Sequence, residues 1–522
     1  MTFKAVSSRF CKIASAVTPV AIFWASGSLG LADVQPSYLQ DKDKGFALAR
    51  KILQDAAASA SKIKSSQYRD YDLPTIAVSQ GRAGDFSGAL RSAAKITDLR
   101  SRALAMADIA FDQSKQSQSD AMNTFQRAIA IATSLPDSYN QAITLGQIAE
   151  LQAKSQTGDA ISTFTTAVQI ATALPKDEYE SKASALFYIG ASQLNSGSLG
   201  AVETFKEASR ALSDVQDNHK KWITAFQLAP FQVRAGDDQS ALTTARSCTD
   251  EKDFKFRSTL LRSVVGAQAS KGDIEGALKT TSEIENETLR EEALGAVIGA
   301  YLKKGDVQEA IRLTDTIQKD WKTKTHALLL IAEAHAKTGD SDKAEQNIQL
   351  AGNLFEKGEA DSPIEVRWGG FLFVNKLLEM DRLKEATKAA LAIKLPAIKV
   401  QALSKVAISV AQKGDTVTAQ RLLEQAVEEK GITGFPLSQI AEAYAQIGDV
   451  PTALKTASRI PREFDRSFAL ERIAAIQTQN GKVKEAVQWA KSLKSPYLKS
   501  SALLGVGLGI LQKFGIERGR TV

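Results

Sequence analysis

Apolar residues recur along this chain at the three- and four-residue spacing of an amphipathic helix. One stretch places Leu437, Ile440, Ala441 and Tyr444 on a single side of such a helix. A half-buried strand would alternate apolar and polar residues, and β-branched residues rarely follow that alternation here. The pattern predicts an all-α protein whose helices each bury one face.

The helical pattern also repeats itself. Residues 330–340 and 439–449 share the sequence Ile-Ala-Glu-Ala-x-Ala-x-x-Gly-Asp, and in both an alanine follows five residues after the glycine. With that alanine as an anchor, units recur at a spacing of about 34 residues, which is typical of stacked helical hairpins. The anchors are Ala89, Ala121, Ala160, Ala201, Ala241, Ala277, Ala310, Ala344, Ala386, Ala419, Ala453 and Ala486.

A Gly-Asp pair divides many of these units into two helices. Glycine accepts the left-handed conformation that ends a helix, and aspartate caps the start of the next one. The small anchor residue then allows the second helix to approach the first closely. The glycines concerned are Gly84, Gly236, Gly272, Gly305, Gly339, Gly414 and Gly448, with Gly481-Lys482 as a near match.

These features resemble the tetratricopeptide repeat family. Ile440-Ala441-x-x-Tyr444, Gly448-Asp449, Ala453 and Ala457 follow the order of its signature. Three earlier units match its second helix, with Phe125, Phe164 and Phe205 between spaced alanines. The first-helix tryptophan of the family is missing, so related hairpin repeats stay open. The resemblance covers roughly residues 69–510 and implies a right-handed α-solenoid, or superhelix, of about twelve helix-turn-helix repeats.

A basic residue stands four positions before the leucine of most first helices. A ladder of ligand-binding cations is one interpretation. The interpretation favoured here is structural, because a cation between two helices complements the dipole at the end of the preceding helix. The residues are Arg69, Arg100, Lys182, Arg257, Arg290, Lys324, Lys399, Arg466 and Lys499.

The N-terminus has the order of an export signal. Lys4, Arg9 and Lys12 precede an acid-free apolar stretch over residues 13–32 that ends in small residues. We expect cleavage after Ala32, so that the mature chain begins at Asp33, and a periplasmic or secreted location. An uncleaved membrane anchor is the alternative. No later stretch is apolar enough to span a bilayer, so no stable membrane insertion is expected after cleavage.

Composition shifts suggest an organisation along the chain. We expect a signal peptide at 1–32, a linker and capping helix at 33–68, and an N-terminal repeat array at 69–355. A C-terminal array with its capping helix follows at 356–515, and a basic tail at 516–522. The internal boundary rests on residues 357–363, whose composition predicts an exposed loop.

Charge and motifs exclude several kinds of chemistry. The formal net charge is +7. The basic residues of the chain are scattered among acidic ones, a distribution that does not indicate nucleic-acid binding. Cys248 is alone once the signal is removed. His219, His326 and His335 show no metal-ligand spacing, and phosphate loops and nucleophile elbows are absent from the sequence. We expect no catalytic residue, no cofactor and no metal.

Stacked hairpins present an extended surface for a partner. The leading hypothesis is therefore an exported, non-enzymatic scaffold that binds a protein or peptide through its first helices. The family geometry places six candidate residues there: Lys303, Glu333, Lys337, Gln412, Glu442 and Gln446. A structural component of an envelope or polysaccharide-export assembly is an alternative, and a helical-repeat enzyme acting on envelope polymers is a further one. The apolar helix at 501–511 is expected to dock either on the preceding unit or on another chain, the second of which would be self-association.

Overall fold

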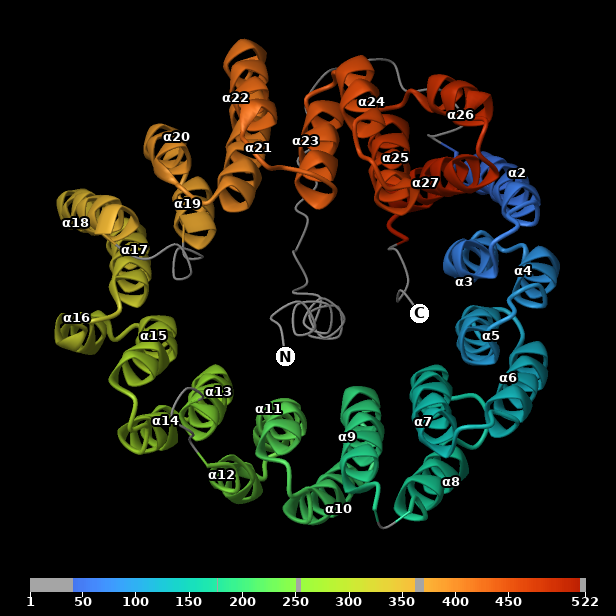
Figure 1. Ribbon diagram of the computed structural model, residues 1–522, viewed down its shortest axis with the longest axis horizontal. Coiled ribbons are helices and arrows are strands. Elements are labelled where there is room, and N and C mark those ends of the chain that lie inside the picture. Colours follow the sequence, from blue (N-terminus) through green and yellow to red (C-terminus); the bar gives the residue numbers. More distant parts are fainter. Residues whose placement is uncertain (1–40, 176, 250–254, 362–369, 517–522) are drawn as a thin grey trace. The chain divides into compact units, whose positions relative to one another are not determined.

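The computed structural model describes residues 41–516 except for 176, 250–254 and 362–369. These residues contain helices α2 to α27 and no strand (Figure 1), which confirms the all-α solenoid. None of the described helices has the length and apolar character that crossing a membrane requires. The predicted signal peptide, Ala32, Asp33 and residues 517–522 lie outside the described residues.

The helices alternate between two layers. First helices lie on the inner side of the series and second helices on its outer side (Figure 1). The first helices are α3 (Ser66–Arg82), α5 (Leu99–Gln113), α7 (Ser138–Ser155), α9 (Tyr179–Ser196), α11 (Asn218–Arg234), α13 (Phe256–Lys271), α15 (Glu287–Lys304), α17 (Trp321–Lys337), α19 (Gly370–Glu379), α21 (Pro396–Gln412), α23 (Phe435–Gln446), α25 (Glu463–Gln479) and α27 (Pro496–Lys513).

The second helices are shorter in most hairpins. They are α2 (Lys42–Ala60), α4 (Phe86–Ala93), α6 (Gln118–Thr133), α8 (Ala160–Thr172), α10 (Ala201–Ser213), α12 (Asp238–Arg246), α14 (Ile274–Ser282), α16 (Val307–Thr316), α18 (Ser341–Asp361), α20 (Leu383–Ala392), α22 (Thr416–Glu428), α24 (Val450–Ser458) and α26 (Val483–Ser492).

The Gly-Asp turns have the predicted geometry. Gly448 adopts a φ of +92°, and the N–H of Asp449 donates to the carbonyl of Tyr444 over 2.9 Å, which closes α23 with a Schellman motif. The Asp449 carboxylate then accepts from the N–H of Thr452 at 3.1 Å and caps α24. One dipeptide thus ends the first helix and starts the second, and all seven predicted glycines have a positive φ.

The anchor alanines occupy the contact between the two helices of a hairpin, with one exception. Eleven of the twelve are buried. Ala160 is partly exposed at the first residue of α8, behind the cap Asp159, whereas Ala201 has the same place in α10 but is buried. The close-approach role predicted for Ala160 is therefore wrong, and Thr163 and Phe164 fill the contact in that hairpin.

Most of the recurring cations hold the end of the preceding second helix. Lys324 donates from Nζ to the carbonyl of Ile317 at 2.9 Å, and Arg466 donates to Ile460 at 2.7 Å. These bonds satisfy carbonyls that a helix C-terminus leaves open. The structural interpretation is confirmed there. Arg100 does not hold the end of the preceding helix, because Arg102 donates to the carbonyl of Ile96 in its place.

A second recurring feature was not predicted: buried glutamines near the ends of first helices. The Oε1 atom of Gln80 accepts from Ser92 at 2.7 Å, and that of Gln232 accepts from Thr244 at 2.9 Å. Both hydroxyls lie on the second helix of the same hairpin. The glutamines therefore tie the two helices of a hairpin together from within.

The expected loop at 357–363 is wrong over its described part. Helix α18 continues to Asp361, so the expected boundary between 355 and 356 falls inside a helix. Gly358 packs so closely on Trp321 that an added Cβ would meet the indole ring at 2.3 Å. Glu359 is buried as well. Composition alone misled here, because glycine and acidic residues are used for packing.

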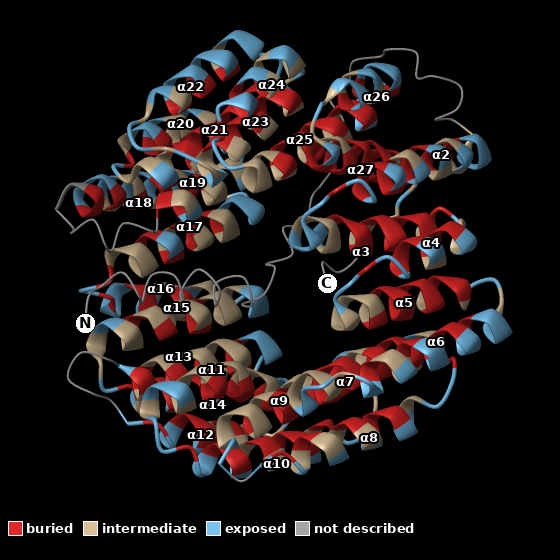
Figure 2. Ribbon diagram, turned by 45° about the vertical axis from the view of Figure 1, so that its right-hand side comes forward, coloured by how far each residue is buried: buried red, intermediate tan, exposed pale blue. Residues whose placement is uncertain are grey.

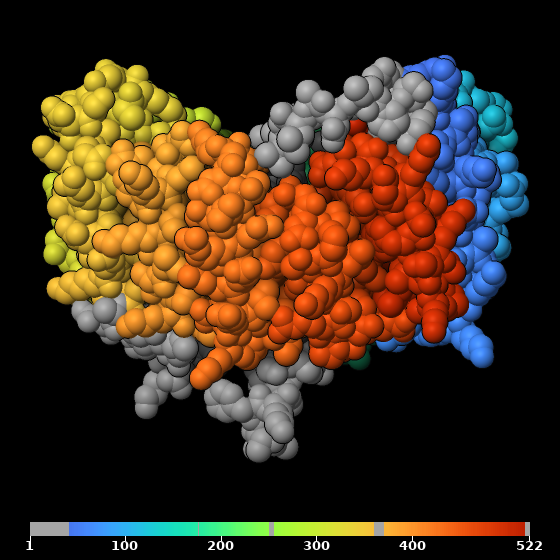
Figure 3. All heavy atoms as spheres, turned by 90° about the horizontal axis from the view of Figure 1, so that it is seen from above, coloured from blue at the N-terminus to red at the C-terminus, as the bar shows by residue number. Residues whose placement is uncertain are grey.

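The series of hairpins closes on itself. Helix α27 packs on α25 and also on α2, from the opposite end of the chain, and Figure 3 shows N-terminal and C-terminal residues side by side. The Ser501 hydroxyl donates to the buried carboxylate of Asp72 at 3.0 Å. Twelve hairpins are continuous in sequence, and α27 with α2 forms a thirteenth that the sequence did not reveal.

Candidate functional site

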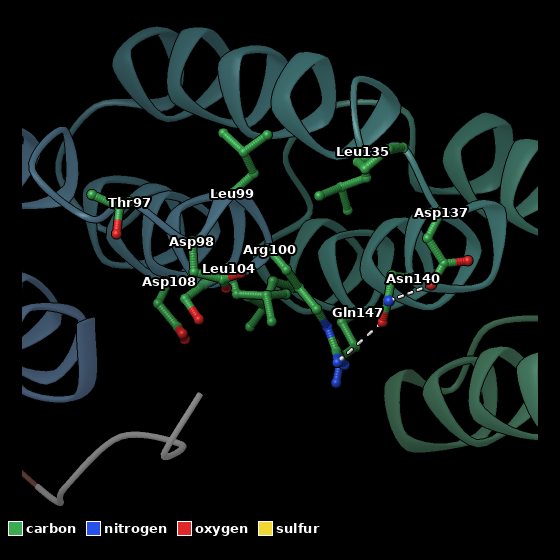
Figure 4. A pocket seen from close by; sticks show the side chains of 13 residues that line it. Thr97, Asp98, Leu99, Arg100, Leu104, Asp108, Leu135, Asp137, Asn140 and Gln147 are labelled. Carbon is green, nitrogen blue, oxygen red and sulfur yellow. Dashed lines mark hydrogen bonds between the residues drawn. The ribbon is translucent and has the colours of Figure 1, made fainter. Parts of the chain in front are cut away.

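A pocket among the described residues lies between two neighbouring first helices, α5 and α7. Its volume is about 670 Å³, and its walls are the start of α5, the link from α6 to α7, and α7 itself (Figure 4). The link is longer than a Gly-Asp turn, and Pro136 prevents α6 from continuing through it. Leu135 of this link lines the pocket together with Leu99 and Leu104 of α5.

Two polar side chains in the pocket have unused hydrogen-bonding capacity. Arg100 donates from Nη1 to Oδ1 of Asn140 at 3.5 Å, while its Nε is buried and has no partner among the described residues. The Oε1 atom of Gln147, on α7, is buried and without a partner too. A partnerless donor and a partnerless acceptor thus line the same pocket, where Figure 4 shows Arg100 extending toward Gln147. Buried polar groups rarely remain in this state.

The acids of the pocket already have structural roles. Asp98 accepts from the N–H of Ser101 at 2.7 Å and caps α5, and Asp137 accepts from the N–H of Tyr139 at 2.9 Å and caps α7. Asp108 is buried and engaged. Two of the three carboxylates therefore hold helix ends, which does not favour an acid and base pair. They also surround the single cation of the pocket with negative charge.

The six residues predicted to bind a partner lie elsewhere. Lys303, Gln412 and Lys337 are exposed near the ends of α15, α21 and α17. Glu333, on α17, contacts both Lys337 and Lys376 of α19, at 2.7 and 2.5 Å. These hydrogen bonds lower the pKa of the Glu333 carboxyl below its usual value. The structure does not bring the six together at one site, and their role in binding stays a prediction.

Glu442 and Glu333 instead link neighbouring first helices, whereas Gln446 bonds within its own helix, α23. Glu442 lies 3.5 Å from Arg472 of α25, and burial raises the pKa of its carboxyl. Gln446 donates to Glu442 over 3.4 Å. Glu333 is joined to Lys376 in the same manner, and Arg262 of α13 pairs with Glu292 of α15 at 2.8 Å. Ion pairs between adjacent first helices are thus a recurring part of the architecture.

Sequence reasoning missed the Arg100 pocket because it assigned Arg100 to the recurring cations. A signal was present nonetheless. A second basic residue, Arg102, stands two residues later in the same helix and can take the structural role in place of Arg100. The position of the 133–137 link beside α5 depends on the packing of the two hairpins, which short-range sequence patterns do not show. Among the described residues, no group of three or more histidine, cysteine or acidic side chains is placed to hold a metal.

Comparisons with known proteins agree with a helical-repeat chain only in general terms. No protein-family model and no curated protein sequence matches it. Ton1535 from Thermococcus onnurineus is 18% identical, over 70% of this chain and 96% of that one, with a TM-score of 0.29. The maize pentatricopeptide repeat protein PPR10 is 14% identical, over 82% and 64%, with a TM-score of 0.30.

Human IFIT1 with PPP-AAAA is a third similar structure, 13% identical over 86% of this chain and 94% of that one, with a TM-score of 0.26. All three TM-scores are low, so the fold is assigned from the helices and turns of the chain itself. By these, the chain is an all-α helical-repeat protein.

Proposed function

We propose that this chain is an exported, non-enzymatic scaffold that binds an extended polypeptide segment of a partner, with the Arg100 pocket as its main contact. The observation that carries the proposal is the pair of partnerless atoms, Nε of Arg100 and Oε1 of Gln147, at one pocket. Export rests on the order of residues in the N-terminal signal pattern.

A peptide unit supplies the two groups that this pair needs. Its carbonyl accepts from Arg100, and its N–H donates to Gln147. Each buried group without a partner costs about 1–3 kcal/mol, so a ligand that satisfies both gains affinity through small side-chain rotations. The leucines of the wall leave room for an apolar side chain beside the peptide unit.

The charge around the pocket selects among such segments. Asp98, Asp108 and Asp137 line it, and Arg100 is the one basic residue of its lining. The field of these groups favours a neutral or basic segment and opposes phosphate-rich ligands. This preference separates a peptide from a nucleic acid as the occupant.

A peptide library selected on the purified chain tests the proposal. We expect neutral or basic extended sequences to be enriched, and Gln147→Leu to weaken their binding by about tenfold or more, since it removes the acceptor but keeps the size of the side chain. Isothermal titration measures the loss. Gln268→Leu is the matched control, because Gln268 also has a buried, partnerless Oε1 but lies in α13, outside the pocket.

The control should bind as the wild-type chain does. Equal binding by the Gln147→Leu variant would show that the peptides use another surface, and no enrichment at all would contradict the peptide-binding function. Export is tested separately by mass spectrometry of the released chain, which should begin at Asp33.

A further inference from the structure

The thirteenth hairpin obeys the rules of the other twelve although its helices come from opposite ends of the chain. Asp41 caps α2 with its side chain, as Asp449 caps α24. Four residues later, where most second helices have the anchor alanine, α2 has the buried Gly45. The first helix of this pair, α27, ends like the others: Gly515 has a φ of +77°, and the N–H of Ile516 donates to Leu511 at 3.1 Å.

The chain is therefore interrupted at a hairpin turn. In a continuous hairpin the Gly-Asp pair joins the two helices, whereas here the corresponding positions, Gly515 and Asp41, lie in opposite end segments. Helix α2 is held by non-covalent contacts with α27 and with α3, and by the connection through residues 61–65 to α3. On the α3 side, Arg50 donates from Nη1 to the carbonyl of Ala83 at 3.1 Å, and Gln54 donates to Asp85 at 2.9 Å. No other hairpin of the described residues is divided in this way.

The glycines of α27 make this junction close. An added Cβ at Gly505 or Gly509 would meet the α25 backbone, at 2.1 Å from the carbonyl oxygen of Glu471 and 2.6 Å from that of Ala475. An added Cβ at Gly507 would meet Cδ2 of Leu53, on α2, at 2.6 Å. Gly507 thus faces Leu53 of α2, whereas Gly505 and Gly509 face α25.

The apolar surface of α27 is buried by other helices of the same chain. Residues 500–511 are all buried, and Figure 2 shows the helix almost entirely in the buried colour. The self-association expected from an exposed apolar helix has no free surface at these residues. A second copy can reach α27 only by replacing the chain's own α2.

We propose that α2 is an exchangeable arm, which can leave its own α27 and pair with the α27 of a second copy of this chain. The surface that receives α2 is built by the same sequence in every copy, so a second copy offers an identical site. Polar contacts cross the junction, with Lys491 Nζ 2.6 Å from Asp55 and the Ser500 hydroxyl donating to Ala56 at 3.4 Å. Covalent tethering favours the closed monomer at low concentration, and high concentration favours exchange.

Two complementary variants test the exchange in the full-length protein. Leu53→Ala leaves a cavity in α2, and Gly507→Val adds the same number of carbon atoms to α27. Each variant alone is mismatched within its own chain. When the two are mixed and incubated below the unfolding temperature, exchange seats the added valine of one chain against the shortened α2 side chain of the other. The second junction of the dimer then regains the original leucine and glycine. The double variant Leu53→Ala, Gly507→Val in one chain is the control and should remain a monomer.

We expect light scattering during gel filtration to show a one-to-one dimer in the mixture, enriched by about tenfold or more over either variant alone, because a buried Leu→Ala cavity weakens closure by more than that factor. A mixture that stays monomeric, with a folded double variant, overturns the proposal. Should the double variant fail to fold, the charge-reversed pair Asp55→Lys and Lys491→Asp applies the same test, and monomers in that mixture overturn it as well.

Discussion

The N-terminal and C-terminal hairpins differ in the type of residue that packs between their two helices at the end of the first helix. The position compared is the one near the end of each first helix whose carbonyl accepts the closing hydrogen bond of the turn. From α3 to α13 this residue is a buried glutamine: Gln80, Gln113, Gln152, Gln193, Gln232 and Gln268. From α15 onward the position is held by Tyr301, His335, Leu377, Val410 and Tyr444, and glutamine returns at Gln477. The backbone turn is the same in both halves.

The difference shows what each choice requires. A buried glutamine needs partners, and Gln80 and Gln232 find them on the second helix, whereas the Oε1 atoms of Gln152, Gln193 and Gln268 have none. An aromatic or aliphatic residue needs only volume. Hydrogen bonding therefore holds some N-terminal hairpins together, and packing holds the C-terminal ones.

Removing packing volume should have the largest effect. Tyr444→Ala empties a buried site, and we expect a loss of about 3 kcal/mol in unfolding free energy. Hydrogen exchange should show the loss in the hairpins around α23 first, because repeats are stabilised mainly by their neighbours. Uniform loss of protection along the chain would contradict this and indicate a single cooperative unit.

Replacing the turn glycine should destabilise the N-terminal and C-terminal hairpins by the same amount. Gly236 and Gly448 have φ values of +88° and +92°, and no atom lies within 4 Å of an added Cβ at either. Valine at either position should therefore cost about 2 kcal/mol through backbone strain alone. Denaturant titration of both variants measures this cost. Unequal losses would show that the turns differ in more than conformation.

The effects of Gln232 and Thr244 on the unfolding free energy should be coupled, because the two side chains share a hydrogen bond. Gln232→Leu leaves the Thr244 hydroxyl without its acceptor, and we expect a loss of about 1.5 kcal/mol. Gln232→Leu with Thr244→Val removes both groups and should recover most of that stability. A double-variant cycle with no coupling would mean that the glutamine acts by volume, as Tyr444 does.

The smallest effect concerns pH. Burial raises the pKa of Tyr444 from 10.0 to about 12, so the neutral phenol is favoured in the folded state. The corresponding stability is present below pH 10 and is lost as the pH rises from 10 toward 12. Tyr444→Phe should remove this part of the pH dependence, and thermal unfolding of both proteins across that range measures it. Identical profiles would contradict the raised pKa.

Sequence reasoning recovered what is local and periodic. The hairpins, their Gly-Asp turns and most anchors follow from short-range preferences, which is why Gly448 and Asp449 were assigned correctly. Ala160 was misassigned because burial at the first residue of a second helix differs between hairpins, as the buried Ala201 shows, and residues 357–361 because buried glycine and glutamate resemble a loop in composition.

The features that sequence reasoning missed depend on contacts between distant residues. The Arg100 pocket needs the α6–α7 link to pack beside α5, and closure needs α27 to meet α2. Neither contact leaves a periodic pattern. Gly505, Gly507 and Gly509 were visible in the sequence, but the backbone of α25 and Leu53 of α2, which explain them, come from other parts of the chain.

The thirteenth hairpin, α27 with α2, also constrains the order in which the hairpins can form during synthesis. Helix α2 is the first described helix to emerge during synthesis, and α27, which packs against its Leu53, is the last of the described helices. Every other hairpin can pair as soon as its own residues are available. The α27-facing side of α2 must therefore wait until α27 has been made, and the pairing of these two helices is the last of the thirteen hairpins to form.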